Sequence, residues 1–341
     1  MKPLVGITMG DPAGIGPEIV VKALASPDIH TKCIPIVIGD RISLEYACSY
    51  CGPDMELRPV TDVSQCQGLP GTIEFLDPGV IKSKVQLGKV DATCGEAAFR
   101  YVTTAIGMAM DGTINAVVTA PINKESINLA GHDFPGHTEI FAHYTNTHPG
   151  QYAMMLASGN LRVIHATTHV SLRNACDLIT TDRVLKTIRL ARQGVEAMGV
   201  INPRIGVAGL NPHSSENGLF GSEEETAIIP AIMAAIAEGV SAEGPIPPDT
   251  IFVKAMGGIY DVVVAMYHDQ GHIPLKLHGF RLSNEAASVG GINATIGLPI
   301  IRTSVDHGTA FDRAGKNTAD PQSLIDAIDM AIKMSNATSA C

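Results

Sequence analysis

Short apolar runs rich in β-branched residues recur along the chain, and many are separated by stretches with the hydrophobic period of a helix. This alternation requires an α/β fold with a mostly parallel sheet, because parallel strands are buried on both faces and are joined by crossover helices. The runs that predict strands are 4–9, 34–39, 114–120, 152–157, 161–166, 204–210, 261–267 and 298–304. The clearest amphipathic segments are 16–26, 96–112, 181–199, 223–239 and 321–335. The polar, glycine-containing segment 281–297 is expected to be a loop.

The composition excludes several classes of protein. Apolar residues make up 45% of the 341 residues and charged ones 17%, which is typical of a globular chain. A net charge of -10 argues against a nucleic-acid partner. No stretch has the ~18 apolar residues of a membrane span, and the first ten residues do not resemble a secretory signal. The lone CxxC of Cys48 and Cys51 has no second pair for a zinc site. We therefore expect a cytoplasmic protein with reduced thiols.

One histidine follows each of three predicted strands: His169, His213 and His268. Ligands of open α/β sheets bind beyond the carboxyl ends of the strands. Three imidazoles meeting there would hold a divalent metal and leave positions open for substrate. The alternative is three separate core or capping histidines, and no HExxH-type motif decides between the two.

Acidic residues surround the second of these histidines. Glu216 and Glu223 are candidates to orient ligating imidazoles through hydrogen bonds. Ser222 and Glu225 have the spacing of a capping box at the start of the next helix.

Three further segments carry polar groups where ligands would bind. The turn "GDPAGIG" (10–16) lacks the spacing of a dinucleotide fingerprint and is expected to be a tight turn, with Asp11 facing the cleft. His137 and Thr138 offer an imidazole and a hydroxyl to a phosphate or carboxylate, or else begin a helix. Arg302 follows a strand and can clamp an anion with two hydrogen bonds. The loop "DHGTAFDRAGKN" (306–317) is a candidate nucleotide cradle.

These motifs form a recognisable set. "GDPAGIGPEI", "TAPINKE", "PGHTE", "GLNPHSSENGLFGSEE", "MYHDQGHIPLK" and "GLPIIRTSVDHGTAFD" together resemble the 4-hydroxythreonine-4-phosphate dehydrogenase family of vitamin B6 biosynthesis, over essentially the whole chain. "HGTAFDRAGKN" is similar to the adenosine-binding loop of the isocitrate and isopropylmalate dehydrogenases. The resemblance implies a two-lobed α/β fold of the isocitrate dehydrogenase kind with the active site in the interlobe cleft. It implies a cofactor-side lobe of residues 1–125 plus 296–341 and a metal, substrate and dimerisation lobe of residues 126–295.

The resemblance also implies the contents of the site. It implies a homodimer whose active sites lie at the subunit interface, and a divalent metal (Zn, Mg, Co or Mn) held by His169, His213 and His268 of the partner subunit. It implies substrate contacts from His137, Thr138, Lys276, Asn293 and Arg302. The implied cofactor is NAD or NADP, bound along His307, Gly308, Thr309, Ala310, Asp312 and Asn317. The loop has no Arg or Lys pair clearly set for a 2′-phosphate, which favours NAD, whereas Arg313 and Lys316 are the residues that could serve NADP.

The implied reaction is NAD(P)-dependent oxidation and decarboxylation of a 4-phosphorylated 3-hydroxy acid, in the first place 4-phosphohydroxy-L-threonine. Lys276 and Arg302 would hold the anionic ends of the substrate, the metal would act as a Lewis acid, and Asp249, Lys276 or a metal-bound water would act as the base.

Other readings remain open. Compared with the biosynthetic enzymes the chain carries an insertion near 282–290, which we predict to be a lid or specificity loop. Related enzymes act on 4-phospho-D-threonate, 4-phospho-D-erythronate or a dihydrodiol of terephthalate, and these classes of substrate are alternatives. A metal-dependent hydrolase that uses the three histidines and a non-catalytic binding protein of this fold are the alternatives from other classes.

Overall fold

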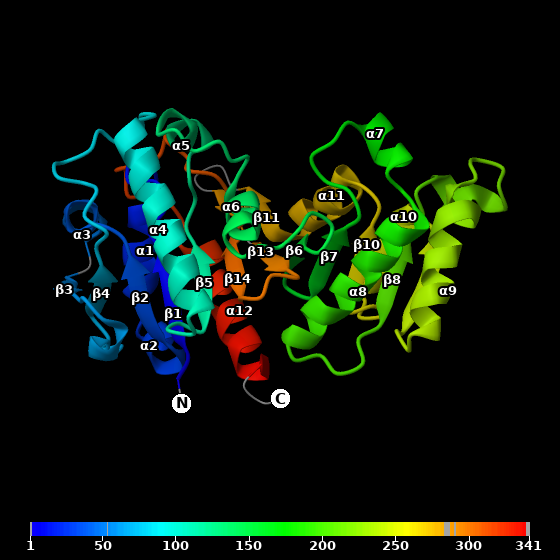
Figure 1. Cartoon of the computed structure of the whole chain (residues 1–341), viewed down its shortest axis with the longest axis horizontal. Helices are drawn as coiled ribbons and strands as arrows, with labels where there is room; N and C mark the ends of the chain where they lie inside the picture. The colour runs from blue at the N-terminus through cyan, green and yellow to red at the C-terminus, as the bar shows by residue number, and fades with distance from the viewer. Residues whose placement is uncertain (1, 53, 283–286, 290, 339–341) are drawn as a thin grey trace. The chain divides into compact units, whose positions relative to one another are not determined.

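The computed structural model describes residues 2–52, 54–282, 287–289 and 291–338. The chain forms two compact units (Figure 1). The first comprises Met1–Thr147, Ser288–Ile292 and Leu298–Ala340, and the second comprises His148–Ala287 and Asn293–Gly297. Both units alternate strands with helices around parallel strands, so the predicted α/β class is confirmed. Within the described residues, none of the helices combines the length and apolarity that a membrane crossing requires.

The first unit has the strand order β3-β4-β2-β1-β5-β14, with all these neighbours parallel. Its strands are β1 (Leu4–Thr8), β2 (Ile34–Ile38), β3 (Glu56–Pro59), β4 (Thr72–Leu76), β5 (Ala116–Thr119) and β14 (Arg302–Val305). Its helices are α1 (Gly16–Leu24), α2 (Pro27–Lys32), α3 (Arg41–Cys51), α4 (Ala92–Met110), α5 (Lys124–Leu129), α6 (His137–Tyr144) and α12 (Gln322–Thr338), with a short 3₁₀ turn η1 (Val63–Gln65).

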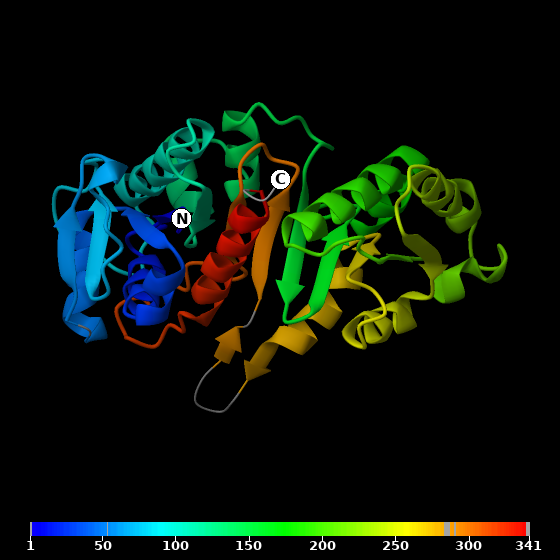
Figure 2. The same ribbon diagram turned by 90° about the horizontal axis from the view of Figure 1, so that it is seen from below.

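The second unit has the strand order β13-β6-β7-β10-β8-β9. Its strands are β6 (Ala153–Ser158), β7 (Leu161–His165), β8 (Ile205–Ala208), β9 (Ala242–Ile246), β10 (Val262–Ala265) and β13 (Ile292–Ile296). Its helices are α7 (Leu172–Asp177), α8 (Thr181–Ala197), α9 (Ile229–Ala237), α10 (Pro248–Met256) and α11 (His268–Gly279). β6 and β7 form an antiparallel hairpin, drawn as neighbouring green strands in Figure 2, whereas β7, β10, β8 and β9 run parallel.

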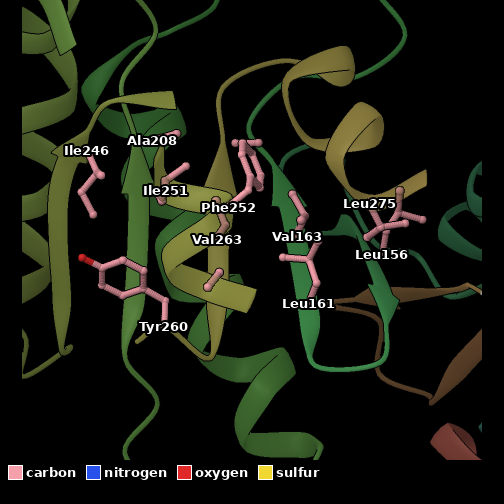
Figure 3. Close-up of a cluster of buried hydrophobic side chains, with 12 residues drawn as sticks. Leu156, Leu161, Val163, Ala208, Ile246, Ile251, Phe252, Tyr260, Val263 and Leu275 are labelled. Carbon is pink, nitrogen blue, oxygen red and sulfur yellow. The ribbon is translucent and has the colours of Figure 1, made fainter. Parts of the chain in front are cut away.

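A buried apolar cluster fixes α10 and α11 on the sheet of the second unit (Figure 3). Phe252 of α10 and Leu275 of α11 join Val163 of β7 and Val263 of β10 in this cluster. Each such side chain contributes about 1.5–3 kcal/mol when it is fully removed from water. The helix that begins at His268 is therefore held by packing, which fixes where its first turn lies.

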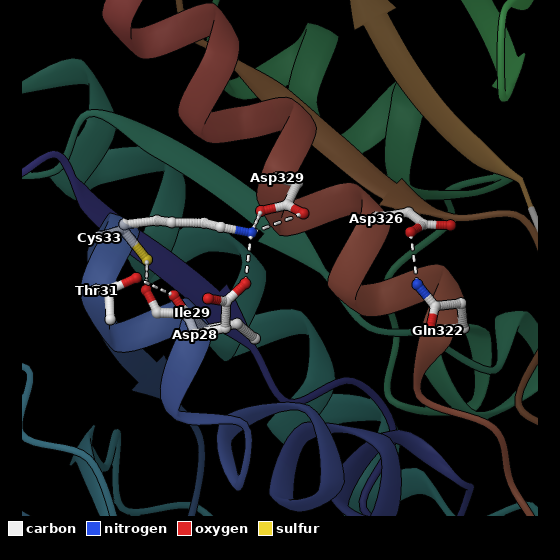
Figure 4. A network of polar contacts seen from close by, with 8 residues as sticks. Asp28, Ile29, Thr31, Cys33, Gln322, Asp326 and Asp329 are labelled. Atoms are coloured by element: carbon white, nitrogen blue, oxygen red, sulfur yellow. Dashed lines mark hydrogen bonds and ion pairs between the residues drawn. The ribbon is translucent and has the colours of Figure 1, made fainter.

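α12 packs on the sheet of the first unit through a buried face that includes Leu324 and Ile328. Its link to α2 is an exposed ion-pair network in which Lys32 contacts Asp28 at 3.0 Å and Asp329 at 3.1 Å (Figure 4). Exposed ion pairs contribute only about 0–1 kcal/mol. Apolar burial, and not this network, therefore anchors the helix.

The prediction of a loop over 281–297 was wrong. β11 (Phe280–Leu282) pairs with β12 (Ala287–Val289) in a separate two-stranded sheet, and β13 follows. Ile292, Ala294, Thr295 and Ile296 are all buried in β13, so the strand belongs to the core although its small and polar residues do not resemble an apolar run. The lid predicted at 282–290 falls largely on residues outside the described ones, so it stays a prediction.

Replacing glycine by alanine should have opposite effects on stability at two positions of α4. A Cβ at Gly95 would overlap the Ser126 carbonyl of α5, whereas a Cβ at the exposed Gly107 would meet no described atom within 4 Å. Gly95→Ala should therefore destabilise the protein by about 1–3 kcal/mol through overpacking. Gly107→Ala should stabilise it by about 0.5–1 kcal/mol through helix propensity. Urea-denaturation midpoints measure both, and a Gly95→Ala midpoint at or above that of the wild type would contradict the packing argument.

Candidate active site

His169, His213 and His268, called here the post-strand histidines, follow neighbouring parallel strands, because β10 lies between β7 and β8. His169 follows β7, His268 begins α11 directly after β10, and His213 lies in the 3₁₀ segment η2 (Pro212–Glu216) after β8. The rings of His169 and His268 are 5.9 Å apart between centroids. His213 packs instead against Phe220, at 5.9 Å between centroids.

Carboxylates orient two of these imidazoles. Asp269 Oδ1 lies 2.6 Å from His268 Nδ1, and Glu216 Oε2 lies 3.1 Å from His213 Nδ1. A carboxylate at Nδ1 fixes the tautomer and leaves Nε2 as the ligating atom, as is usual around protein-bound metals. Glu216 was expected in this role, whereas the sequence offered no role for Asp269.

The chemistry of the three histidines suits a divalent metal, whereas their arrangement in the described part of one chain does not form a complete set of ligands. Imidazoles backed by carboxylates suit a divalent transition metal. Among the described residues of one chain, no group of three His, Cys, Asp or Glu side chains is arranged to hold a metal ion. The site of His169, His213 and His268 of the partner subunit therefore stays a prediction.

Gln270 ties two of the strand ends together. It is buried, its Oε1 accepts a hydrogen bond of 2.6 Å from Met266 N, and its Nε2 donates one of 2.8 Å to Gly209 O. Met266 directly follows β10 and Gly209 directly follows β8. The side chain thus sets the spacing of the two strand ends from which His268 and His213 extend.

A stack of neutral histidines supports His268. The ring of His272 lies 3.7 Å from that of His268 at an interplanar angle of 12°, and His272 Nδ1 donates to the His268 carbonyl at 2.9 Å. Burial lowers the pKa of His272 to about 4 and that of the fully buried His165 to about 3, so both rings are neutral at neutral pH. A Cβ at Gly271 would overlap His165 Nε2, which explains the glycine. His165 carried no signal in the sequence, since it ends an ordinary buried strand.

The loop that carries His213 has an unusual backbone. Residues 213–217 all have positive φ, between 47° and 65°, although none is glycine. This left-handed conformation costs roughly 1–2 kcal/mol for each such residue. The loop can persist only if its surroundings hold it.

Glu224 provides that support. The side chain is buried, its Oε1 accepts from Leu210 N at 2.8 Å and from Asn211 N at 2.7 Å, and its Oε2 accepts from Asn211 Nδ2 at 2.8 Å. Glu224 also begins a π-helical turn η3 (Glu224–Ile228). The predicted capping box of Ser222 and Glu225 is not formed, because no side chain caps this turn.

The first unit contains a separate cationic site. Arg302 begins β14, is buried, and donates from Nη2 to Thr119 Oγ1 at the end of β5 at 3.0 Å. Its guanidinium lies 5.5 Å from the centre of the Phe141 ring. Burial lowers the pKa of Arg302 to about 10, so the group remains charged at neutral pH. A buried guanidinium of this kind suits a phosphate or carboxylate.

His137 begins α6 beside this arginine. Burial, and then the positive charges of Arg302 and Lys124, hold the pKa of His137 well below its usual range. Its Nε2 is shielded from solvent and has no hydrogen-bond partner among the described residues. Gly136 is the N-cap of α6 and no side chain caps the helix, so the Thr138 hydroxyl is not used as a cap. Imidazole and hydroxyl are both available to an anion.

The predicted nucleotide loop packs against two other segments of the first unit. Ile15 N, in the turn 10–16, donates to Thr309 O at 3.0 Å, and Gly88 N donates to Ala13 O at 2.8 Å. A Cβ at Gly88 would come within 2.7 Å of Phe311 O. Bare backbone thus lines this region, as close approach of a dinucleotide requires.

Two side chains stabilise the same region. Asp11 is fully buried, its Oδ1 accepts from Ala13 N at 2.8 Å, and burial raises its pKa to about 6. His307 is half-buried, and burial lowers its pKa. Ala310 and Asn317 adopt positive φ of 40° and 56°.

The remaining predicted site residues lie in the second unit. Lys276 is exposed on α11, Asp249 is exposed on α10, and Asn293 lies in β13. The structure does not test their assigned roles.

Comparison with known proteins assigns the family. The family model described as pyridoxal phosphate biosynthetic protein PdxA matches residues 31–331. The chain is 48% identical over 327 residues to the D-threonate 4-phosphate dehydrogenase of Cupriavidus necator, covering 96% of this chain and 95% of that one. It is 48% identical over 335 residues to the 4-hydroxythreonine-4-phosphate dehydrogenase of Desulfosudis oleivorans, covering 97% and 96%. The crystal structure of 4-hydroxythreonine-4-phosphate dehydrogenase from Klebsiella pneumoniae aligns with a TM-score of 0.87 at 43% identity, covering 98% of each chain.

The fold and these relatives define an enzyme, a dehydrogenase that acts on a CH–OH group. The chain belongs to the PdxA family. The resemblance seen in the sequence motifs is thereby confirmed.

Because the Glu224 carboxylate holds the strained loop, its isosteric replacement by glutamine should destabilise that loop. Glu224→Gln replaces one accepting oxygen by an NH₂ group that faces N–H donors, and should cost about 1–3 kcal/mol of stability. Amide hydrogen exchange across 209–217 should become faster. Glu225→Gln, at an exposed neighbouring position, is the matched control and should change neither quantity. Unchanged exchange in Glu224→Gln would show that other contacts hold the loop.

Proposed function

We propose that the protein oxidises and decarboxylates a 4-phosphorylated 3-hydroxy acid with NAD or NADP and a divalent metal. The observation that carries the proposal is the set of three histidines after neighbouring strands, two of which have Nδ1 held by a carboxylate, in a family of dehydrogenases. The buried charge of Arg302 supports an anionic substrate. The cradle around Thr309 supports a dinucleotide.

The residues have distinct parts in this reaction. When bound, the metal would supply a Lewis acid and the nicotinamide a hydride acceptor. His169, His213 and His268 of the partner subunit would hold the metal, and loop 306–317 would hold the dinucleotide. Asp269 and Glu216 accept hydrogen bonds at Nδ1 of His268 and His213 and so direct the Nε2 atoms as the ligating nitrogens.

The substrate is bound through its anionic groups. Arg302 and the neutral His137 would bind one anionic end, and Lys276 and Asn293 are the further residues proposed to contact the substrate. Lys276 or Asp249 would take the hydroxyl proton as the carbon loses hydride. The 3-keto acid then loses its carboxylate as CO₂, and a proton returns to the adjacent carbon.

The substrates named for the relatives are the first to compare. The Cupriavidus necator relative is named for D-threonate 4-phosphate and the Desulfosudis oleivorans relative for 4-hydroxythreonine-4-phosphate. Both are 4-phosphorylated acids, so their shared phosphate and carboxylate would meet the same cationic residues. The choice between them, and 4-phospho-D-erythronate, would then rest with residues near the predicted 282–290 loop.

A kinetic assay tests the proposal. Purified protein with each of the three acids, each cofactor and added divalent metal should produce reduced nicotinamide and CO₂ in equal amounts. Chelation should abolish turnover, and His213→Ala should lose both metal and turnover while keeping the fold. Release of inorganic phosphate without cofactor reduction would favour the metal-dependent hydrolase instead.

We further propose that the protein is a homodimer that shares these sites. A groove of about 640 Å³ runs between α10 and α11, and its apolar lining includes Phe252, Val253, Met256, Ile273, Pro274 and Leu277. Val253 is 70% exposed and Leu277 is 80% exposed in the single chain. Exposed apolar side chains gathered around a groove are a feature of interaction sites. A second copy is the occupant that fits, because α11 also carries His268 and one chain leaves the metal set incomplete.

Leu277→Glu should convert the dimer to a monomer, because a carboxylate would be buried without a partner at the interface. Sedimentation velocity measures the change. Leu129→Glu, on α5 at 61% exposure, is the matched control and should remain dimeric. A dimeric Leu277→Glu protein would exclude this face as the interface.

A further inference from the structure

A second cationic pocket lies in the first unit. Its lining residues belong to the segment that leads from β4 to α4, two elements labelled in Figure 1. The pocket has a volume of about 400 Å³ and is lined by residues between 81 and 93. Three of its lining residues are Lys82, Lys84 and Lys89. None of the residues assigned to substrate or metal lines it, so the proposed reaction leaves it unexplained.

The charges of these lysines are not balanced by nearby acids. The chain has a net charge of -10, and lysines such as Lys32 and Lys186 are paired with carboxylates. Lys82, Lys84 and Lys89 form no ion pair with the carboxylates of the described residues, and Lys84 Nζ instead lies 3.6 Å from the centre of the Tyr46 ring. Cations left without partners around a cavity favour an anionic ligand.

The start of α4 adds to the positive potential. α4 has 19 residues, and Thr93 of its first turn lines the pocket. The positive end of a helix dipole attracts anions. Asp91, the one acid in the lining, is the N-cap of α4 and accepts from Cys94 N at 3.0 Å. Three lysines against one carboxylate leave two positive charges (3 − 1 = 2) around the cavity.

The same segment also forms part of the dinucleotide cradle. Gly88 N donates to Ala13 O at 2.8 Å, and Gly88 closely approaches Phe311 O. Leu87 lies against Gly315, where a Cβ would come within 2.5 Å of Leu87 Cδ1. Residues 81–93 therefore border both the lysine pocket and the loop proposed to hold the adenosine.

We propose that the pocket formed by Lys82, Lys84 and Lys89 binds a phosphate of the dinucleotide cofactor. This inference rests on the proposed function, which supplies the dinucleotide. The phosphate is either the 2′-phosphate of NADP or the pyrophosphate common to NAD and NADP. The first case would make these lysines determinants of cofactor choice, together with Arg313 and Lys316 of loop 306–317.

Calorimetric titration distinguishes the two sources. Wild-type protein and the variants Lys82→Gln, Lys84→Gln and Lys89→Gln are each titrated with NAD, NADP, ADP and 2′,5′-ADP. Loss of a charged hydrogen bond should weaken binding by about 10-fold per engaged lysine. If the 2′-phosphate is bound, only NADP and 2′,5′-ADP weaken. If the pyrophosphate is bound, NAD, NADP and ADP weaken together.

Lys186→Gln removes the same charge from the exposed surface of α8 and serves as the control. It should bind every ligand as the wild type does, and all four variants should melt at the wild-type temperature because each lysine is exposed. Wild-type affinity for all four ligands in all three pocket variants would overturn the inference and leave the proposed function standing. A wild-type protein that binds neither NAD nor NADP would overturn both.

Discussion

The hydrogen bonds of Gln270 are the interaction on which the placement of His268 and His213 depends. A buried amide pays for its desolvation only if its donor and acceptor are both used, and here the acceptor takes the backbone N–H after β10 while the donor reaches the carbonyl after β8. Two neighbouring strands are thereby locked at the ends where their loops diverge. α11 starts at one of these ends and the His213 loop at the other. This is why a buried strand can stop abruptly in a cluster of titratable residues: the amide satisfies the backbone there, and the histidines are left to bind a ligand.

The contacts that hold His268 differ in kind from those that hold the His213 loop. On the α11 side His268 is held by a stacked neutral ring, by a carboxylate and by a helix packed on an apolar core, all of which are low-energy arrangements. On the β8 side His213 lies in a run of left-handed residues, and Glu224 accepts hydrogen bonds from Leu210 and Asn211 just before that run. One imidazole is therefore rigid and the other is held under strain. A strained loop responds to binding more readily than a packed helix does, so we expect the His213 side to adjust when the site is completed.

The sequence predicted those elements whose burial is visible in their own pattern of apolar residues. Strands such as β1, β2 and β10 are continuous apolar runs and were predicted at nearly their observed bounds. β4 was not predicted, because the buried Glu74 interrupts its run of apolar residues. Glu74 forms an ion pair with Arg58, a partner that no local sequence pattern reveals. The last predicted strand begins at 302 and not 298, because Gly297 turns the chain with a φ of 94°. Histidines could be proposed from their place after strands, whereas Asp269, Glu224 and Gln270 act through contacts that only the folded chain creates.

The two cationic sites of the first unit differ in burial, so they should respond differently to salt. Arg302 is 2% exposed, so its desolvation cost is met once, during folding, and an arriving anion encounters the charge in a medium of low dielectric constant. The lysines of the second pocket are exposed, and their attraction for phosphate is screened at separations beyond roughly 8–10 Å in physiological salt. An acidic chain repels anions at long range, so both sites act only at short range. In the proposed reaction the buried site would therefore discriminate among phosphorylated acids by geometry, whereas the exposed one would adjust the affinity for a dinucleotide whose adenosine binds elsewhere.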